Sequence, residues 1–111
     1  MNKFLSTLCV IIFTANSVNV CAGDALAQQG RKVYELWCTP CHAPGAQHPG
    51  TNALTAKYQG EIPAVLEQRP GLTKEFITQF VRNGVSIMPF FRKTEISDEE
   101  LDALAAYLSR D

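Results

Sequence analysis

The segment Cys38-Thr39-Pro40-Cys41-His42 constrains this chain more than any other part of its sequence. Two cysteines that are two residues apart, followed at once by a histidine, form the attachment pattern of c-type haem. The spacing has a physical reason, because two thiols must reach two vinyl groups on one edge of a porphyrin while the next imidazole lies beneath the iron. No other common use of a Cys-x-x-Cys pair requires that histidine. The segment therefore predicts one covalently attached haem.

Other uses of the cysteine pair explain the sequence less well. A thioredoxin-like dithiol would need alternating strands and helices, which the chain lacks. A zinc site would need four ligands, and the neighbours Cys41 and His42 cannot easily both point at one tetrahedral ion. A structural disulfide is the simplest alternative, since exported proteins often carry one.

The same five residues resemble the attachment site of the c-type cytochromes. This resemblance implies an all-α, single-domain class I cytochrome c fold, in which three to five helices surround one haem c and its iron. It also implies that Cys38 and Cys41 carry the thioether bonds and that His42 is the proximal iron ligand.

The stretch after the attachment site, residues 43–51, is rich in proline and glycine, so we expect an ordered loop there. In cytochromes, a backbone carbonyl in this region accepts the ring proton of the proximal histidine. Residues 50–54 resemble the usual Gly-Pro-x-Leu, with Thr51 in place of proline, which leaves that carbonyl open between Pro49 and its neighbours. His48 lies too close to the proximal histidine to reach the opposite face of the iron, and we expect it to be solvated.

The N-terminus has the three parts of a secretory signal peptide: a positive start, the apolar residues 4–13, and small residues before a cleavage site. We expect cleavage after Ala22, with Ala27 as a second candidate, and a mature domain of residues 23–111. The apolar run is far shorter than the roughly 20 residues that span a bilayer. The sequence therefore predicts a periplasmic protein without a stable membrane anchor, its signal being residues 1–22.

The composition agrees with a small exported haem protein. Of the four cysteines, Cys9 and Cys21 would leave with the signal, so that haem uses the other two and no free thiol persists in an oxidising compartment. The net charge of −1 comes without any basic stretch, which argues against nucleic acid as a partner. A domain this small buries little apolar surface, so we expect the apoprotein to fold poorly.

Apolar periodicity and capping residues predict two helices that cross and hold the ends of the chain together. The first is expected to begin at an Asp24 cap and to end near Trp37. The last begins at the capping box formed by residues 97–100. We expect Gly30 of the first helix to meet Ala105 of the last, because small residues allow close approach.

Between these helices, we expect a short helix over residues 52–59 and a brief one within residues 62–70. A better one begins at Thr73, a good N-cap, and ends at Gly84. Its apolar side is expected to be buried in a core that includes the haem; that side consists of Phe76, Ile77, Phe80 and Val81.

Met88 is the only methionine besides the initiator, and it lies next to Pro89 in the loop that follows this helix. In cytochromes, a Met-Pro step on such a loop brings a thioether to the open face of the iron, so the resemblance implies that Met88 is the second axial ligand. A methionine that only fills a gap in the core is the alternative. The next residues, 90–93, are two phenylalanines and two cations, which we expect to form a docking patch. The alternative is that one ring packs inward and the cations are merely solvated.

An iron held by both His42 and Met88 has no free position for a substrate. We therefore expect a non-enzymatic protein that exchanges single electrons. The alternative is an open iron site, as in a small haem enzyme or sensor.

Residues 80–84, residues 88–90 and the acidic start of the last helix are similar to the cytochrome subunit of flavocytochromes of the p-cresol methylhydroxylase and eugenol hydroxylase type. This similarity implies a flavoprotein dehydrogenase or hydroxylase that oxidises a 4-alkylphenol and donates electrons to this chain. A downstream electron acceptor protein would complete the path. A free carrier between another periplasmic dehydrogenase and a terminal oxidase is the alternative.

Overall fold

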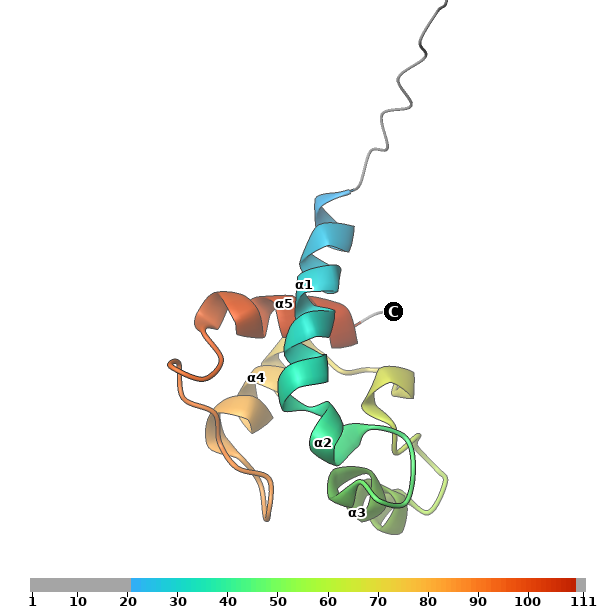
Figure 1. Ribbon diagram of the computed structural model, residues 1–111. Helices are drawn as coiled ribbons and strands as arrows, with labels where there is room; N and C mark the ends of the chain where they lie inside the picture. The colour runs from blue at the N-terminus through green and yellow to red at the C-terminus, as the bar shows by residue number, and fades with distance from the viewer. Residues whose placement is uncertain (1–20, 110–111) are drawn as a thin grey trace, which may run out of the picture.

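The computed structural model describes residues 21–109, which form an all-α arrangement (Figure 1). The elements in chain order are α1 (Ala22–Trp37), α2 (Thr39–His42), α3 (Pro49–Tyr58), the 3-10 turn η1 (Leu66–Gln68), α4 (Lys74–Asn83) and α5 (Asp98–Leu108). Within the described residues there is no strand, and an isolated bridge joins Val85 to Met88. The expected all-α fold is confirmed. The proposed signal sequence lies outside the described residues except for Cys21 and Ala22.

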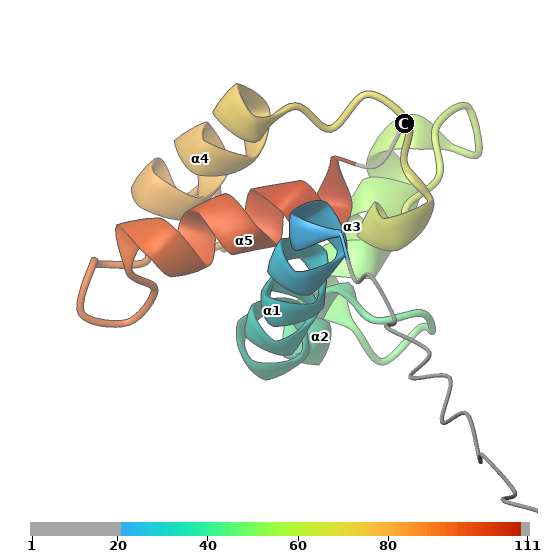
Figure 2. The same cartoon turned by 90° about the horizontal axis from the view of Figure 1, so that it is seen from above.

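Helix α5 lies between α1 and α4, and α1 crosses it at a steep angle (Figure 2). The crossing is close because α1 has a glycine where the helices meet. A Cβ atom added to Gly30 would overlap the backbone carbonyl of Ala103. The predicted packing role of Gly30 is therefore confirmed, but its predicted partner Ala105 is wrong. Residues two positions apart on a helix point about 200° apart around its axis, so Ala103 and Ala105 face different neighbours.

The buried apolar side chains of α1, α4, α5 and the segments beside them form one core. On the apolar side of α4, Ile77 and Val81 are buried in this core, whereas Phe76 is exposed and Phe80 is half-buried. The two phenylalanine rings pack on each other instead, with centroids 4.6 Å apart. The core consists of Val33, Tyr34, Leu72, Ile77, Val81, Ile96, Leu101, Leu104, Ala105, Tyr107 and Leu108.

The predicted helix caps are confirmed where the sequence signal is specific. The Thr73 hydroxyl accepts a hydrogen bond from the backbone N–H of Phe76, and α4 ends at Gly84 with a positive φ of 68°. Ser97 and Glu100 form the complete capping box of α5. Such caps bond backbone groups that have no partner within the helix, so the sequence fixes these ends locally.

Two other helix starts differ from the expectation. Helix α1 begins after Cys21, and Asp24 lies in its first turn, where the helix dipole favours a carboxylate without a capping bond. Helix α3 begins at Pro49, three residues before the expected start, because proline is preset for the first helical turn. The loop after the attachment site is correspondingly shorter than predicted.

No helix among residues 21–109 has the length and apolar character needed to cross a membrane.

Candidate haem attachment site and axial-ligand loop

Cys38, Cys41 and His42 lie on a helical turn that follows α1 directly. The backbone N–H of Cys38 bonds the Tyr34 carbonyl at 2.9 Å, and the N–H of His42 bonds the Cys38 carbonyl at 2.8 Å. Residues three and four apart on a helix share a face. The turn therefore places both thiols and the imidazole on one side, as attachment to one porphyrin edge requires.

The two thiols have different surroundings. Cys41 is exposed, whereas Cys38 is half-buried, and burial together with the nearby Cys41 raises the pKa of Cys38 to about 12. No disulfide joins the two cysteines in the structure, contrary to the simplest alternative considered above. No group of three or more metal-binding side chains occurs among the described residues, which also contradicts the zinc alternative.

Three backbone carbonyls within or just after α2 are held by side chains. Sequence analysis missed two of these donors, Tyr34 and Thr51, both of which are buried. His48 was expected to be solvated but is half-buried against the attachment turn. The contacts are Tyr34 Oη to the His42 carbonyl at 3.2 Å, Thr51 Oγ1 to the Ala43 carbonyl at 2.8 Å, and His48 Nδ1 to the Pro40 carbonyl at 3.1 Å.

The His42 ring is prepared to act as a neutral ligand. Burial, and then the positive charge of Arg69, lower the pKa of His42, which favours the uncharged imidazole that binds metals. Its buried Nδ1 has no hydrogen-bond partner among the described residues, so the expected carbonyl from Pro49 or its neighbours is not found. Gly50 lies against the ring instead, and a Cβ there would be 2.7 Å from Cε1.

Residues 84–97, which we call the Met88 loop, connect α4 to α5. Val85 and Met88 exchange two backbone hydrogen bonds of 3.1 and 2.9 Å, which fold the loop into a tight turn. Gly84 allows this turn, because a Cβ there would be 2.6 Å from the Met88 carbonyl oxygen. In the view of Figure 1, the Met88 loop and α2 extend from the α1–α5 crossing toward the same end of the molecule.

Phe91 ties the Met88 loop to the end of α1, directly before the attachment turn. Its N–H bonds the Val81 carbonyl at 2.8 Å, and its ring meets the Trp37 ring edge-on with centroids 5.7 Å apart. Trp37 directly precedes Cys38. The two segments that the sequence assigns to the haem are therefore joined by an aromatic contact.

Of the residues 90–93 expected to form a docking patch, one ring packs inward, as the alternative had it. Phe91 packs inward, while Arg92 pairs with Glu95 and Lys93 pairs with Asp98 in ion pairs of 3.3 and 2.6 Å. Phe90 stays exposed, and so do both cations, although each has an ion-pair partner within this chain.

The sequence analysis also missed Arg82. Its side chain is only 18% exposed and lies against the Met88 loop, where it bonds the carbonyls of Phe91 and Ile96 and the carboxylate of Asp98. Arg82 follows Val81, a buried residue of an amphipathic helix, and this position is the sequence signal that could have indicated its role.

Large apolar side chains are exposed on α4 and the Met88 loop. A group of such side chains marks a surface that binds a ligand or a partner. The two thiols on one helical face, the neutral His42 and exposed apolar side chains for a porphyrin to cover are the features that a covalently attached haem requires. The side chains are Phe76, Val85, Ile87 and Phe90, with exposed fractions of 45, 50, 76 and 60%.

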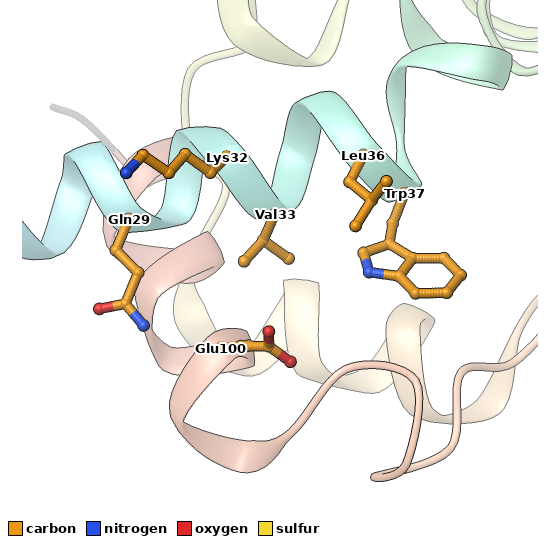
Figure 3. Close-up of a pocket in the computed structure, with 6 residues that line it drawn as sticks. All are labelled: Gln29, Lys32, Val33, Leu36, Trp37 and Glu100. Atoms are coloured by element: carbon orange, nitrogen blue, oxygen red, sulfur yellow. The ribbon is translucent and has the colours of Figure 1, made fainter.

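A shallow groove of about 200 Å³ lies elsewhere, between α1 and the start of α5 (Figure 3). In Figure 3, side chains from α1 face Glu100 of α5 across it. None of the proposed haem-binding residues lines this groove. Its lining is Gln29, Lys32, Val33, Leu36, Trp37 and Glu100.

Comparison with known proteins identifies the class of protein that this fold and motif define. The family described as "Cytochrome C oxidase, cbb3-type, subunit III" matches residues 25–108. The chain therefore belongs to the c-type cytochromes, and its cofactor is covalently attached haem c with its iron.

Particular relatives are similar over most of the chain. It is 34% identical to the 4-cresol dehydrogenase [hydroxylating] cytochrome c subunit of Pseudomonas putida, covering 81% of this chain and 70% of that one. It is also 34% identical to cytochrome c6 of Bryopsis maxima (71% and 84% covered) and 32% identical to cytochrome c6 of Leptolyngbya boryana (74% and 88% covered). No solved structure matches the chain significantly. The class I cytochrome fold and the likeness to the cytochrome subunit of a cresol-oxidising enzyme are thus confirmed.

Proposed function

We propose that this c-type cytochrome carries single electrons on a six-coordinate haem, with Cys38 and Cys41 as the thioether residues and His42 and Met88 as the axial ligands. The observation that carries this proposal is the single helical face shared by both thiols and a neutral imidazole. The constrained Met88 loop is tied through Phe91 to Trp37, directly before that face. When bound, haem c supplies a one-electron iron couple.

The residues around the site suit electron transfer more than catalysis. With both axial positions filled by His42 and Met88, no substrate reaches the iron. The buried donors Tyr34 and Thr51 hold the attachment turn, and the tight Val85–Met88 turn holds the other ligand. A ligand set held in this way changes little when its charge changes, which favours rapid exchange of electrons.

The ligand set is tested by replacing Met88 with Ala in haem-loaded protein. Loss of the thioether is expected to lower the reduction potential, abolish the sulfur-to-iron charge-transfer absorption and allow carbon monoxide to bind the ferrous form. The wild type should bind carbon monoxide only slowly. An unchanged absorption spectrum in the Met88→Ala protein would refute the assignment, and rapid binding by the wild type would favour an open-site enzyme or sensor.

We also propose that the protein is exported and that its signal is cleaved after Ala22. The support is the sequence pattern alone: an apolar run too short to span a membrane, followed by small residues. The intact mass of the haem-loaded protein from the periplasmic fraction tests this. A mass that includes residues 1–22 would contradict it, and cleavage after Ala27 would correct the site.

For the partner, we propose a flavoprotein that oxidises a 4-alkylphenol and passes electrons to this haem. The support is the similarity to the cytochrome subunit of 4-cresol dehydrogenase. Purification of the tagged chain from its native cell should bring down a flavoprotein, and 4-cresol should then reduce the haem within that complex. Recovery of the cytochrome without any flavin would contradict this partner.

A free carrier between another dehydrogenase and a terminal oxidase is the second candidate. The two cytochrome c6 relatives favour it, because their names mention no enzyme subunit. In that case the cytochrome purifies alone, and the membrane fraction of the same cell oxidises its reduced form.

A further inference from the structure

Arg82 donates hydrogen bonds to the Met88 loop and to the start of α5. Its Nη1 donates to the carbonyls of Phe91 at 3.1 Å and Ile96 at 2.8 Å, while its Nη2 meets Asp98 Oδ1 at 2.9 Å. These acceptors lie 9, 14 and 16 residues further along the chain. One guanidinium therefore joins α4, the second half of the Met88 loop and the start of α5.

The contacts have the form of a clamp on the loop and not of a surface ion pair. Exposed ion pairs contribute little, but the Arg82 side chain is largely buried and two of its acceptors are backbone carbonyls. A planar guanidinium can serve several acceptors in fixed directions, which the single ammonium of lysine cannot do. Without Arg82, those carbonyls would lose a charged donor.

The clamp acts on the part of the loop that carries Met88. Phe91 is held on three sides: its N–H by Val81, its carbonyl by Arg82 and its ring by Trp37. Phe91 is only three residues after Met88. Release of Phe91 would free one end of the segment whose other end is fixed by the Gly84 turn.

We propose that Arg82 is a positioning residue that holds the Met88 thioether in place by clamping the Phe91 and Ile96 carbonyls. This inference rests on the proposed ligand set. Arg82 would not contact the iron itself. It would instead lower the rate at which the Met88 thioether dissociates from the iron and opens the axial position.

The test compares haem-loaded Arg82→Leu with Arg92→Leu. Arg92 is an exposed arginine of the Met88 loop whose side chain pairs with Glu95. Arg82→Leu should keep its covalent haem but bind carbon monoxide to the ferrous form at least about tenfold faster, which corresponds to about 1.4 kcal/mol. Its sulfur-to-iron absorption should also weaken on mild warming. Arg92→Leu should match the wild type in both measurements.

Two variants keep the outcome decisive. If Arg82→Leu does not yield folded protein, Arg82→Lys replaces it. It should bind carbon monoxide faster than the wild type, but by a smaller factor than expected for Arg82→Leu, because lysine keeps the charge and loses the planar arrangement of donors. A folded Arg82 variant with wild-type carbon monoxide kinetics would overturn the clamp. Met88→Ala separates the two proposals. An unchanged absorption spectrum in Met88→Ala refutes the ligand set. A changed spectrum in Met88→Ala, together with wild-type carbon monoxide kinetics in the Arg82 variant, refutes only the clamp.

Discussion

The attachment turn and the Met88 loop are both held by hydrogen bonds to backbone carbonyls, but the donors come from different distances along the chain. At the attachment turn, each donor lies eight residues from its acceptor, as with Tyr34 and His42 or Thr51 and Ala43. At the Met88 loop, the donor Arg82 reaches carbonyls 9 and 14 residues away, and Trp37 contacts Phe91 from another helix.

This difference predicts how the two regions respond when the protein is destabilised. A turn held by nearby residues keeps its shape whenever its own segment is folded. A loop held by distant residues depends on the packing of α1, α4 and α5, so it opens first when that packing weakens. The thioether bonds would secure the first region covalently, while the Met88 side of the haem relies on tertiary structure alone.

The largest effect is expected from removing the covalent attachment. The double variant Cys38→Ala with Cys41→Ala, expressed with the haem-attachment machinery, should contain no covalent haem, because neither vinyl group has a thiol to react with. Haem staining after denaturing electrophoresis measures this. A stained band at the mass of the variant would refute the attachment site, while Cys21→Ala should stain like the wild type if Cys21 leaves with the signal.

The next effect comes from the helix crossing that supports both regions. In Gly30→Ala, the new methyl group would overlap the Ala103 carbonyl, and we expect the free energy of unfolding to fall by about 3 kcal/mol. Nothing lies within 4 Å of a Cβ at Gly23, so Gly23→Ala is the matched control and should leave stability unchanged or slightly raised. Chemical denaturation of the haem-loaded protein gives both values. Equal values for the two variants would contradict the close crossing.

The comparison also explains what the sequence allowed us to predict. The Cys-x-x-Cys-His spacing, the Thr73 cap and the capping box at Ser97 are local patterns whose physics involves a few neighbouring residues, and the last two agree with the structure. The role of Gly30 was predictable from its cost within a helix, but its partner was not, because that depends on how α5 is rotated.

The interactions missed from sequence are those that tertiary packing creates. Arg82 looks like an ordinary solvent-facing arginine until α4 and the Met88 loop are placed side by side. Likewise, Phe76 has the helical spacing of a core residue yet is exposed in the structure. The anchoring role of Thr51 was hidden because its side chain, and not its backbone, makes the contact with Ala43.

A smaller effect is expected from the local anchors of the attachment turn. Thr51→Val keeps the shape of the buried side chain but removes its hydrogen bond to the Ala43 carbonyl, and we expect a loss of about 1 kcal/mol in stability. Carbon monoxide binding should stay slow, because the Met88 loop is held independently. Thr55→Val, on the same helix and with its own bond to the Thr51 carbonyl, is the comparison that separates loss of the turn anchor from loss of any α3 hydroxyl. Faster carbon monoxide binding in Thr51→Val would show that the two regions are coupled.

The smallest expected effect is the pH dependence of the stability that Asp98 contributes. The hydrogen bond from Lys93, and to a lesser extent that from Arg82, lowers the pKa of the exposed Asp98 from its ordinary value of 3.8. A carboxylate with a lowered folded pKa adds stability above its ordinary pKa, and this stability is lost as the pH falls through the folded value. The difference in melting temperature between wild type and Asp98→Asn should therefore be constant near neutral pH and shrink below about pH 4. Because this ion pair is solvent-exposed, added salt should shrink the difference as well. A gap that widens on acidification would mean that Asp98 is not stabilised as the carboxylate.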